Sequence, residues 1–561
     1  MFKEEIAKLI AKEVKLKKEE ILSLLEVPPQ EEMGDFAFPC FKLGKNPVEE
    51  AGKLAGKISK NKVIERVEQK GPYLNFFVKK EFFVKDTLVK IQKEKKKYGF
   101  VKKNKKKILV EYSAPNTNKP QHLGHVRNNL TGMAVSNLLE SQGYGVVRLN
   151  WINDRGIHIC KSMLAYIKWG KGKKPNKKTD HFVGDFYVKF AQELKKNPKL
   201  EEEAQELLKK WEAGDSELRK LWKKMNGWTY EGFKETYQEL GCEFDKWFYE
   251  SEIFEEGKKL VLKAFEKKIL EKDEQGNILA NLEKYNLGKK VLLRADGTSI
   301  YSTADIALGV EKAKYKPFKS LYVVGNEQKF YFQQLFKILE LFGLKDYAKV
   351  CKHLNYGMIF LPEGKMKSRE GKVIDADDLM QEMVDEARKE IKKRHKKLSK
   401  GEVEKRAKMI GLGALKFFTL KFDVQRDFVF DPEESISFEG ETGPYVQYTH
   451  ARICSILRKA KQKISTKISF EVFNQEEEIR VVKLLGNFPQ VVEKAAEDYK
   501  PHLVARYLID LAQTFNEFYH KCPVISEMEQ VMKARLLLVD SVRQILENGL
   551  KLLGISAPEE M

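Results

Sequence analysis

The chain has 561 residues, 42% of them hydrophobic, so it is too long for one core and has material for about three to five domains. Its 103 lysines and arginines outnumber its 82 aspartates and glutamates, giving a formal net charge of +21. This surplus favours a polyanionic partner, although the lysine-rich surface of a heat-adapted protein would give the same composition. No apolar run approaches the roughly 20 residues that cross a bilayer, so we expect no membrane-spanning helix.

Two further features bear on the compartment. The six cysteines are scattered without a C-x-x-C pair, which argues against a zinc ribbon or a disulfide framework. Residues 1–13 form an amphipathic stretch with acidic side chains, unlike a secretory signal peptide. We therefore expect a soluble, cytoplasmic protein without a structural metal, and we take a monomer as the default state.

The first block, residues 1–100, mixes helical periodicity with strand-like runs. A helix is followed by the turn G-D-F-A-F-P at Gly34–Pro39, a second helix and an apolar strand at Leu74–Val78. This mixture predicts a small α+β module in addition to the main domains. A lysine-rich stretch at 95–107 leads into the next block and is either an RNA-binding segment or a solvated linker.

The second block, residues 105–380, alternates strands with helices. This pattern predicts a doubly wound, parallel nucleotide-binding sheet of the Rossmann type. A polar helical stretch rich in Lys, Trp and Tyr, near 165–290, is interpreted as an insertion. The strands are expected at Leu109–Ser113, Val146–Trp151, Leu321–Val324 and Tyr356–Phe360.

Helical periodicity prevails beyond residue 380. We expect a helical connector at 381–435 and an α-helical bundle at 436–561. The predicted fold class is therefore α/β multidomain, with an N-terminal α+β module, a Rossmann-type domain carrying an insertion, and a C-terminal helical bundle.

The segment Glu111–Gly132 combines a strand end, a turn and a helix start. The turn falls at 114–116, and helical spacing begins directly after His122. His122, Gly124 and His125 therefore lie at a helix N-terminus, which presents unpaired N–H groups and the positive end of a dipole to an anion. We predict a nucleotide site here. The histidines could instead ligate a metal, but no third ligand lies near them in sequence.

Motifs in a fixed order carry a family resemblance. H-L-G-H at 122–125 resembles the H-x-G-H signature of class I aminoacyl-tRNA synthetases, and the preceding S-A-P-N-T-N-K-P resembles the arginyl-tRNA synthetase form. G-D-F-A-F-P and Y-L-N-F-F near the N-terminus resemble the family's added N-terminal domain, which implies that residues 1–100 are an additional tRNA-binding module. T-G-P-Y-V-Q-Y-T-H-A-R-I at 442–453 and L-G-I-S-A-P-E-E-M at 553–561 resemble its anticodon-binding domain, which implies this role for the bundle at 436–561. Similar matches are Y-S-T-A-D-I-A-L at 301–308, V-G-N-E-Q at 324–328 and G-K-M-K-S-R-E-G at 364–371.

The resemblance implies an arginine-tRNA ligase. The carboxylate of L-arginine would attack the α-phosphate of ATP, which enters with Mg²⁺, and the arginyl group would then pass to the terminal adenosine of tRNA(Arg). Because the nucleophile is already an anion, the site needs alignment and positive charge rather than a strong base. The family is also among the few synthetases that need bound tRNA before they activate the amino acid.

The second family signature departs from its usual form, K-M-S-K-S. Ser368 stands where the catalytic lysine is usual, and a lysine comes one position early. We expect Lys119 to replace the missing lysine; the alternative is an exposed surface lysine. The catalytic residues that the resemblance implies are Lys119, His122, His125, Lys365, Lys367 and Arg369. The implied ATP-binding residues are His122, Gly124, His125, Gly325, Glu327, Met358, Ile359, Lys367 and Ser368.

Recognition of arginine needs a buried carboxylate, because a carboxylate matches the two-pronged geometry of a guanidinium. The resemblance gives this role to Asp305, with Tyr301 one helical turn earlier; on spacing alone, Asp305 could cap a helix or pair with Arg294, and Tyr301 could be core. Ala114 is a second departure, because the family more often has a small hydroxyl there. The implied arginine-binding residues are Glu111, Ser113, Asn116, His122, Tyr301, Asp305 and Gln334.

Contacts to tRNA are expected at the start of the C-terminal bundle, at Tyr445, Gln447, Tyr448 and Arg452. Aromatic and basic side chains suit unpaired anticodon bases, although each residue could equally belong to a core or a solvated face. Two rival functions stay open: a class I synthetase for lysine or glutamate, and a non-catalytic RNA-binding relative, which the altered second signature would favour.

Overall fold

The computed structural model describes residues 2–28, 30–58, 63–362, 374–395 and 397–561. Its contacts divide the chain into two compact units: Met1–Tyr98 with Ile453–Phe488 and Leu511–Ile545, and Gly99–Arg452 with Pro489–Asp510 and Leu546–Met561. No helix in the described ranges has the length and apolarity needed to cross a membrane. Four C-terminal helices contribute residues to both units: α17 (Gly443–Ala460), α18 (Glu476–Asp498), α19 (His502–Lys521) and α20 (Glu529–Leu552).

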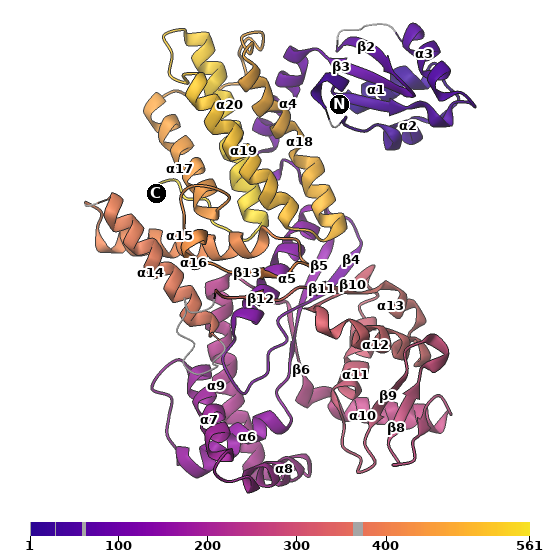
Figure 1. Ribbon diagram of the computed structural model, residues 1–561, viewed down its shortest axis with the longest axis vertical. Helices are drawn as coiled ribbons and strands as arrows, with labels where there is room; N and C mark the ends of the chain where they lie inside the picture. The colour runs from indigo at the N-terminus through magenta and orange to yellow at the C-terminus, as the bar shows by residue number, and fades with distance from the viewer. Residues whose placement is uncertain (1, 29, 59–62, 363–373, 396) are drawn as a thin grey trace. The chain divides into compact units, whose positions relative to one another are not determined.

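The N-terminal part of the first unit is an antiparallel sheet with helices (Figure 1). Its strands β1 (Phe36–Pro39), β3 (Tyr73–Val78) and β2 (Ile64–Lys70) lie in the order β1-β3-β2. The central strand β3 is buried from Leu74 onward, which explains its continuous apolar run, whereas β2 is mostly exposed. This is the predicted α+β module; its helices are α1 (Phe2–Ala11), α2 (Lys18–Leu24), α3 (Pro47–Lys57) and α4 (Lys80–Glu94).

The second unit is built on a five-stranded parallel sheet, which confirms the predicted class. Its order, β11-β10-β4-β5-β6, is that of a doubly wound sheet in which the winding direction reverses between β4 and β10. Ligands of such sheets bind outside the carboxyl ends of the strands at this reversal. The strands are β4 (Lys107–Glu111), β5 (Gly145–Ile152), β6 (Lys246–Tyr249), β10 (Lys319–Gly325) and β11 (Cys351–Tyr356).

The predicted single insertion at 165–290 is wrong in one respect, because β6 lies within it and belongs to the main sheet. A strand of four residues carries too little periodicity to be recognised among helices. Before β6 come α6 (Ile157–Ala165), α7 (Thr179–Leu194), α8 (Lys199–Glu212) and α9 (Ser216–Leu240). After β6 come α10 (Glu250–Glu266), a small antiparallel sheet of β7 (Glu271–Lys272), β8 (Ile278–Asn281) and β9 (Lys289–Leu293), and α11 (Tyr301–Ala313).

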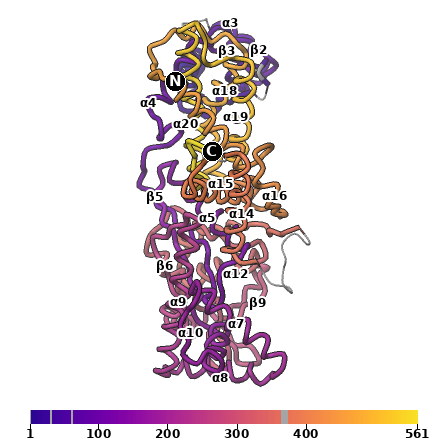
Figure 2. Tube along the Cα trace, turned by 90° about the vertical axis from the view of Figure 1, so that its left-hand side faces the viewer, coloured from indigo at the N-terminus to yellow at the C-terminus, as the bar shows by residue number. Residues whose placement is uncertain are grey.

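Helix α5 (Leu123–Ser141) is buried along most of its length. It contacts the sheet at β4, β5 and β10 and also the connector helices α14 (Ala376–Arg394) and α15 (Lys400–Leu420), which lie side by side (Figures 1 and 2). The predicted strand Tyr356–Phe360 is divided between the end of β11 and β12 (Ile359–Phe360), which pairs with β13 (Phe428–Val429). The remaining elements are the 3-10 helix η6 (Asn326–Gln328), α12 (Lys329–Leu341), α13 (Lys345–Val350) and α16 (Pro432–Ser435).

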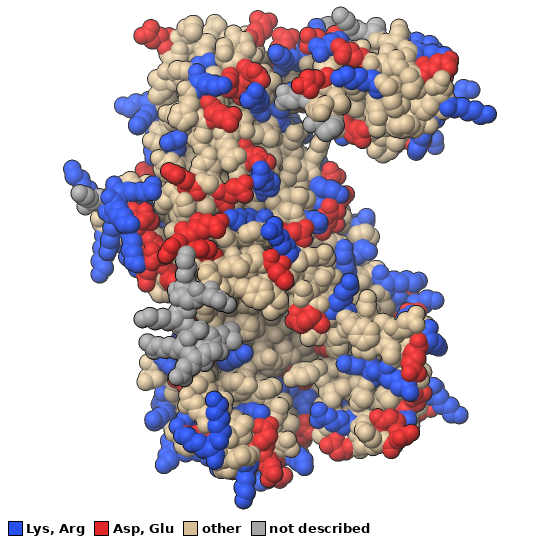
Figure 3. All heavy atoms as spheres, viewed as in Figure 1, with Lys and Arg blue, Asp and Glu red and all other residues tan. Residues whose placement is uncertain are grey.

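The positive net charge is not gathered on one patch of the face in Figure 3. There, lysine and arginine side chains alternate with acidic ones over the N-terminal module and over the helices of the second unit. Many exposed lysines form ion pairs with acidic residues three or four positions away on the same helix, as Lys389 does with Glu386. Ion pairs of this kind contribute little to stability. They explain how the surface carries many charged side chains, but they do not determine the fold.

Candidate active site

A cavity of about 440 Å³ lies at the reversal point of the parallel sheet. Glu111 closes β4 on one side of it, and β10 contributes Tyr322 and Val324 on the other. This is the position where a doubly wound sheet binds its ligand. The rest of the wall is Ala114, Asn116, Trp151, Asn153, Glu250, Lys290, Ile300, Tyr301, Ser302, Asp305, Leu308, Gln328, Tyr331, Phe332 and Leu335.

The turn after β4 is held in an unusual backbone conformation. Ser113 and Ala114 both have positive φ, 76° and 49°, which side chains other than glycine rarely adopt. Buried asparagines hold them there: Ser113 N–H donates to Asn128 Oδ1 at 2.6 Å, and Ala114 N–H donates to Asn150 Oδ1 at 3.3 Å. The turn is therefore preset before any ligand arrives, and it presents Ala114 and Asn116 to the cavity.

Three residues predicted for arginine binding lie outside the cavity wall: Ser113, Gln334 and His122, which is the N-cap of α5. The Ser113 hydroxyl is buried and hydrogen-bonded to the Tyr237 hydroxyl at 2.7 Å. Gln334 is also buried and donates its Nε2–H to the Leu287 carbonyl at 2.8 Å. These two assignments are corrected, because both side chains already bond within the protein, while α12 turns Tyr331 toward the cavity instead.

The charged side chains of the cavity wall are partly compensated. Glu111 forms a buried ion pair with Lys312, and Glu250 pairs with Arg155 at 3.3 Å. Asp305 accepts a hydrogen bond from the Tyr331 hydroxyl but makes no ion pair within the described ranges. Lys290 also lines the wall.

Charge counting on this set gives a net negative cavity. Glu111, Glu250, Asp305 and Glu212, the second partner of Arg155, carry four negative charges when ionised. The cations Lys290, Lys312 and Arg155 supply three. At least one negative charge is left over, since Asp154 also faces Glu250, and a cationic ligand group would complement this surplus.

Burial acts on two of these carboxyl groups. It raises the pKa of Asp305 to about 6, against the hydrogen bond from Tyr331, which lowers it. It raises the pKa of Glu250 to about 7, against Arg155, which lowers it. A buried cation between the two would favour their charged forms, so ligand binding and ionisation support each other.

A close helix contact sets the spacing of Glu250 and Asp305. Glu250 begins α10 and Asp305 lies in α11, and the two helices touch at Gly257 and Thr303. A Cβ at Gly257 would lie 2.2 Å from the Thr303 carbonyl oxygen. Only glycine therefore permits the approach that brings both carboxylates to one cavity.

The H-L-G-H residues lie where the sequence places them, because α5 begins at Leu123 with His122 as its N-cap. His122 Nδ1 accepts the Gly124 N–H at 3.1 Å, and His125 Nδ1 accepts the His122 N–H at 3.2 Å. With Nδ1 accepting, the proton of each neutral ring is on Nε2. Both rings thus offer an N–H donor at the positive end of a helix dipole.

The two histidines stay neutral near pH 7. Burial and the nearby Lys119 ammonium lower the pKa of His122 to about 4 and hold that of His125 well below its ordinary value. The turn that carries Lys119 packs tightly on α7, where a Cβ at Gly184 would lie 2.7 Å from Pro120 Cδ. Lys119 is thereby fixed within electrostatic reach of both rings.

Predicted nucleotide residues are gathered around the start of α5. Asn128 Nδ2–H donates to the Val323 carbonyl at 2.9 Å, which holds α5 against β10 just before Gly325. The Arg127 guanidinium donates to the Met358 carbonyl at 2.8 Å. Gly325 ends β10, Glu327 is exposed in η6, Met358 is partly exposed and Ile359 is buried in β12. Lys365, Lys367, Ser368 and Arg369 lie outside the described residues.

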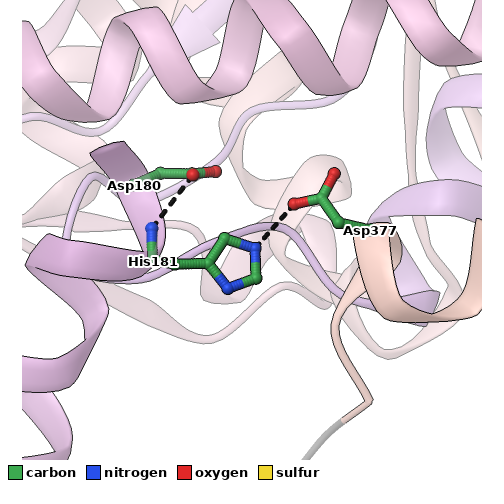
Figure 4. Close-up of side chains that lie close together, drawn as sticks. All are labelled: Asp180, His181 and Asp377. Carbon is green, nitrogen blue, oxygen red and sulfur yellow. Dashed lines mark hydrogen bonds and ion pairs between the residues drawn. The ribbon is translucent and has the colours of Figure 1, made fainter. Parts of the chain in front are cut away.

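Asp180, His181 and Asp377 form a second polar cluster (Figure 4). His181 Nε2 lies 2.7 Å from Asp377 Oδ2, and this hydrogen bond raises the pKa of His181. The Lys178 ammonium lies 2.7 Å from the same oxygen and 3.3 Å from Asp180. Lysine thus supplies the positive charge that a metal ion would otherwise bring, and we interpret the cluster as an ion-pair network.

This network ties the start of α14 to α7 beside the H-L-G-H turn. Leu123 N–H donates to the Ile374 carbonyl at 3.1 Å, and Ala376 N–H donates to the Gln121 carbonyl at 2.9 Å. The residues before and after His122 are therefore paired with the segment that leads into α14. A polar cluster outside the cavity thus helps to fix the position of the nucleotide turn.

The predicted tRNA residues of α17 point in different directions. Tyr448 is 37% exposed, and the Arg452 guanidinium lies 5.2 Å from its ring centre. Tyr445 is half-buried. Gln447 is fully buried and donates to the Met409 and Ser556 carbonyls, so the expectation that its side chain reaches RNA is corrected.

Comparison with known families covers almost every part of the chain. The model for the catalytic domain of class I (R) tRNA synthetases matches residues 87–432, which is more than half of the chain. The chain belongs to the arginyl-tRNA synthetases. Two further models agree: the arginyl tRNA synthetase N terminal domain matches residues 1–78, and the DALR anticodon binding domain matches residues 446–561.

Individual members of the family are similar over nearly full length. The arginine–tRNA ligase of Treponema denticola is 44% identical over 558 residues, covering 96% of this chain and 94% of the relative. That of Bacteroides thetaiotaomicron is 42% identical over 557 residues, covering 93% and 92%. The solved arginyl-tRNA synthetase of Thermus thermophilus superposes with a TM-score of 0.83 at 27% identity, covering 100% of this chain and 99% of that one.

These matches confirm the family and the enzyme class expected from the motifs. Sequence reasoning missed most of the cavity wall, including the polar residues Glu250, Lys290, Gln328 and Tyr331. A signal existed for Glu250, because it directly follows β6, and the carboxyl ends of sheet strands carry the ligand site. The signal was lost when β6 was assigned to an insertion.

Proposed function

We propose that the cavity binds the side chain of L-arginine, with the guanidinium between Asp305 and Glu250. The uncompensated negative charge of the wall supports this proposal, because a buried cation needs a counter-ion and a carboxylate satisfies its N–H groups. Glu111 plays a different part from the one expected: paired with Lys312, it shapes the wall and does not receive the guanidinium. Tyr301, which is 61% exposed at the rim, covers the bound side chain.

The other end of arginine then lies toward the start of α5. There the carboxylate attacks the α-phosphate of ATP, which enters as its Mg²⁺ complex, and pyrophosphate leaves. His122 and His125 donate Nε2–H groups to phosphate oxygens as negative charge builds on them. Asn116 lies on the wall between the two sites and contacts the α-amino end of arginine.

Lys119 supplies the positive charge that the altered second signature lacks. Its ammonium already acts on both histidines, so it lies at the phosphate end of the site. Gly325, Glu327, Met358 and Ile359 surround the nucleotide at the ends of β10 and β12. The arginyl group finally passes from the adenylate to a ribose hydroxyl of the terminal adenosine of tRNA(Arg), and AMP leaves.

Binding of tRNA involves the exposed side of α17, where Tyr448 and Arg452 form an aromatic and basic pair, with Tyr445 nearby. We take the working unit to be a monomer. All six cysteines are free thiols, which suits a reducing cytoplasm.

ATP–pyrophosphate exchange with each of the twenty amino acids, with and without tRNA, tests the proposal. We expect exchange with arginine alone and only when tRNA(Arg) is present. Exchange with lysine or glutamate would support the rival synthetases. Binding of tRNA without any exchange would support a non-catalytic relative, and brisk arginine exchange without tRNA would contradict the tRNA requirement.

A further inference from the structure

Arg155 lies behind the cavity wall, in the loop that follows β5. It is 8% exposed, and its guanidinium lies 4.1 Å from the centre of the Phe254 ring. One terminal nitrogen donates to Glu250 Oε1 at 3.3 Å and to Ser299 Oγ at 3.0 Å, and the other pairs with Glu212 at the end of α8. Arg155 thus joins two carboxylates from different helices through one buried cation.

The two oxygens of Glu250 are used unequally. Oε1 is held by Arg155, whereas Oε2 is buried and lacks a hydrogen-bond partner among the described residues. A buried carboxylate oxygen without a partner is costly, so native proteins usually satisfy such an atom. Because Glu250 lines the cavity, a donor on a ligand bound there is a suitable partner for this oxygen.

We propose that Arg155 is a positioning residue for arginine recognition: it binds one oxygen of Glu250, which favours the charged carboxylate, and leaves the other oxygen to the substrate guanidinium. The proposal rests on the proposed binding of arginine in this cavity. In this proposal Arg155 and Glu212 affect arginine specificity through Glu250 and do not contact the substrate.

The groups around Glu250 explain why a resident cation is needed. Burial and two facing carboxylates, Asp154 and Asp305, all raise the pKa of Glu250, and Arg155 opposes them. Glu212, at the end of α8, forms an ion pair with the same guanidinium. The hydroxyls of Tyr301 and Tyr331 face Glu250 from α11 and α12. Without Arg155, Glu250 would be mostly protonated near neutral pH, because the interaction that opposes the rise of its pKa would be gone.

The sign of the pH effect follows from the charge. The folded-state pKa of Glu250 is raised to about 7, so Glu250 becomes protonated as the pH falls through this value and then no longer attracts a guanidinium. The KM for arginine should therefore rise below about pH 7. Loss of Arg155 should move this rise to higher pH, and loss of Glu212 should move it to lower pH, because Arg155 would then serve Glu250 alone.

The test measures the KM for arginine in tRNA-dependent aminoacylation from about pH 6 to about pH 9. For Arg155→Met we expect a KM about tenfold higher than wild type near pH 7, recovery toward high pH, and a midpoint raised by about one unit or more. Arg155→Lys should fall between Arg155→Met and wild type. The KM for ATP should not change in either variant.

A second variant, at Glu212, keeps the test valid if Arg155→Met fails to fold, because it should shift the midpoint of the KM profile in the opposite direction. Glu212 is partly exposed at the end of α8, and Glu212→Gln should fold and lower the midpoint of the arginine KM profile. A wild-type profile in both Arg155→Met and Glu212→Gln would overturn the positioning role. An equal rise of KM at every pH in Arg155→Met would also overturn it, since a merely structural loss has no reason to follow the ionisation of Glu250.

Two other variants separate this inference from the proposed function. If Glu250→Gln and Asp305→Asn both leave the arginine KM unchanged, the cavity does not bind the guanidinium and the proposed function fails. If Glu250→Gln raises the KM and removes its pH dependence while Arg155→Met behaves like wild type, the cavity assignment holds and only the role of Arg155 fails.

Discussion

Replacing Asp305 by asparagine keeps the size and shape of the side chain and removes one charge. Asp305 is the wall carboxylate that makes no ion pair within the described ranges, so in the proposed function the substrate is its counter-ion. Tyr331 can still donate its hydroxyl hydrogen to the asparagine oxygen. The substitution therefore removes charge complementarity and leaves the local hydrogen bond in place.

The size of the expected loss in kcat/KM for arginine follows from the general cost of a broken buried ion pair and from the carboxylate that remains in the cavity. Removing one partner of a buried ion pair costs about 3 to 5 kcal/mol, because the other charge is left without compensation. Glu250 remains in the same cavity and keeps part of the negative charge, so the lower end applies. We expect kcat/KM for arginine to fall by about 3 kcal/mol, or roughly 150-fold.

The assay compares arginine with citrulline, whose head group is a neutral urea, in tRNA-dependent aminoacylation. Asparagine can bond a urea without any charge, so citrulline should gain relative to arginine in the variant. The KM for ATP serves as control and should stay at its wild-type value. If arginine-to-citrulline discrimination is the same in Asp305→Asn and wild type, Asp305 does not read the guanidinium, and Glu250 alone would have to do so.

Three further predictions follow from the geometry. Lys119→Ala should lower kcat by about 10²-fold and leave the arginine KM nearly unchanged in steady-state aminoacylation; wild-type kinetics would assign the charge to the second signature instead. Gly257→Ala should cost about 1 to 3 kcal/mol in the free energy of unfolding, measured with urea, and raise the arginine KM, because its Cβ would meet the Thr303 carbonyl at 2.2 Å. Gly227→Ala is the matched control: it lies inside α9 with open space around it, so it should leave the arginine KM unchanged and stabilise the protein by up to about 1 kcal/mol. The pKa of His122 is lowered to about 4, so His122 stays neutral down to that pH, and kcat at saturating arginine should not fall with a midpoint near pH 6.5 as the medium is acidified. A fall with that midpoint would mean that the reaction needs a neutral histidine whose pKa is close to its ordinary value.

The nucleotide turn could be predicted from the sequence because its determinants are local. A strand, a turn and a helix follow each other within Glu111–Gly132, and the N-cap position of His122 depends only on where helical spacing begins. The motifs that identify the family are equally local. The domain order was also readable, since strand and helix periods change at the block boundaries.

The chemistry of the cavity was decided by tertiary structure. Glu111 stands at a strand end that suits a ligand, and only the fold shows that Lys312 already neutralises it. Glu250 lies at the cavity because it follows β6, a short strand that pairs with β5 from a distant part of the chain. Gln447 has the residue type and spacing of an RNA contact, but the packing of α17 turns it inward. Periodicity reports that one face of a helix is buried, whereas the charge that ends up beside a carboxylate depends on which distant segments the parallel sheet brings together.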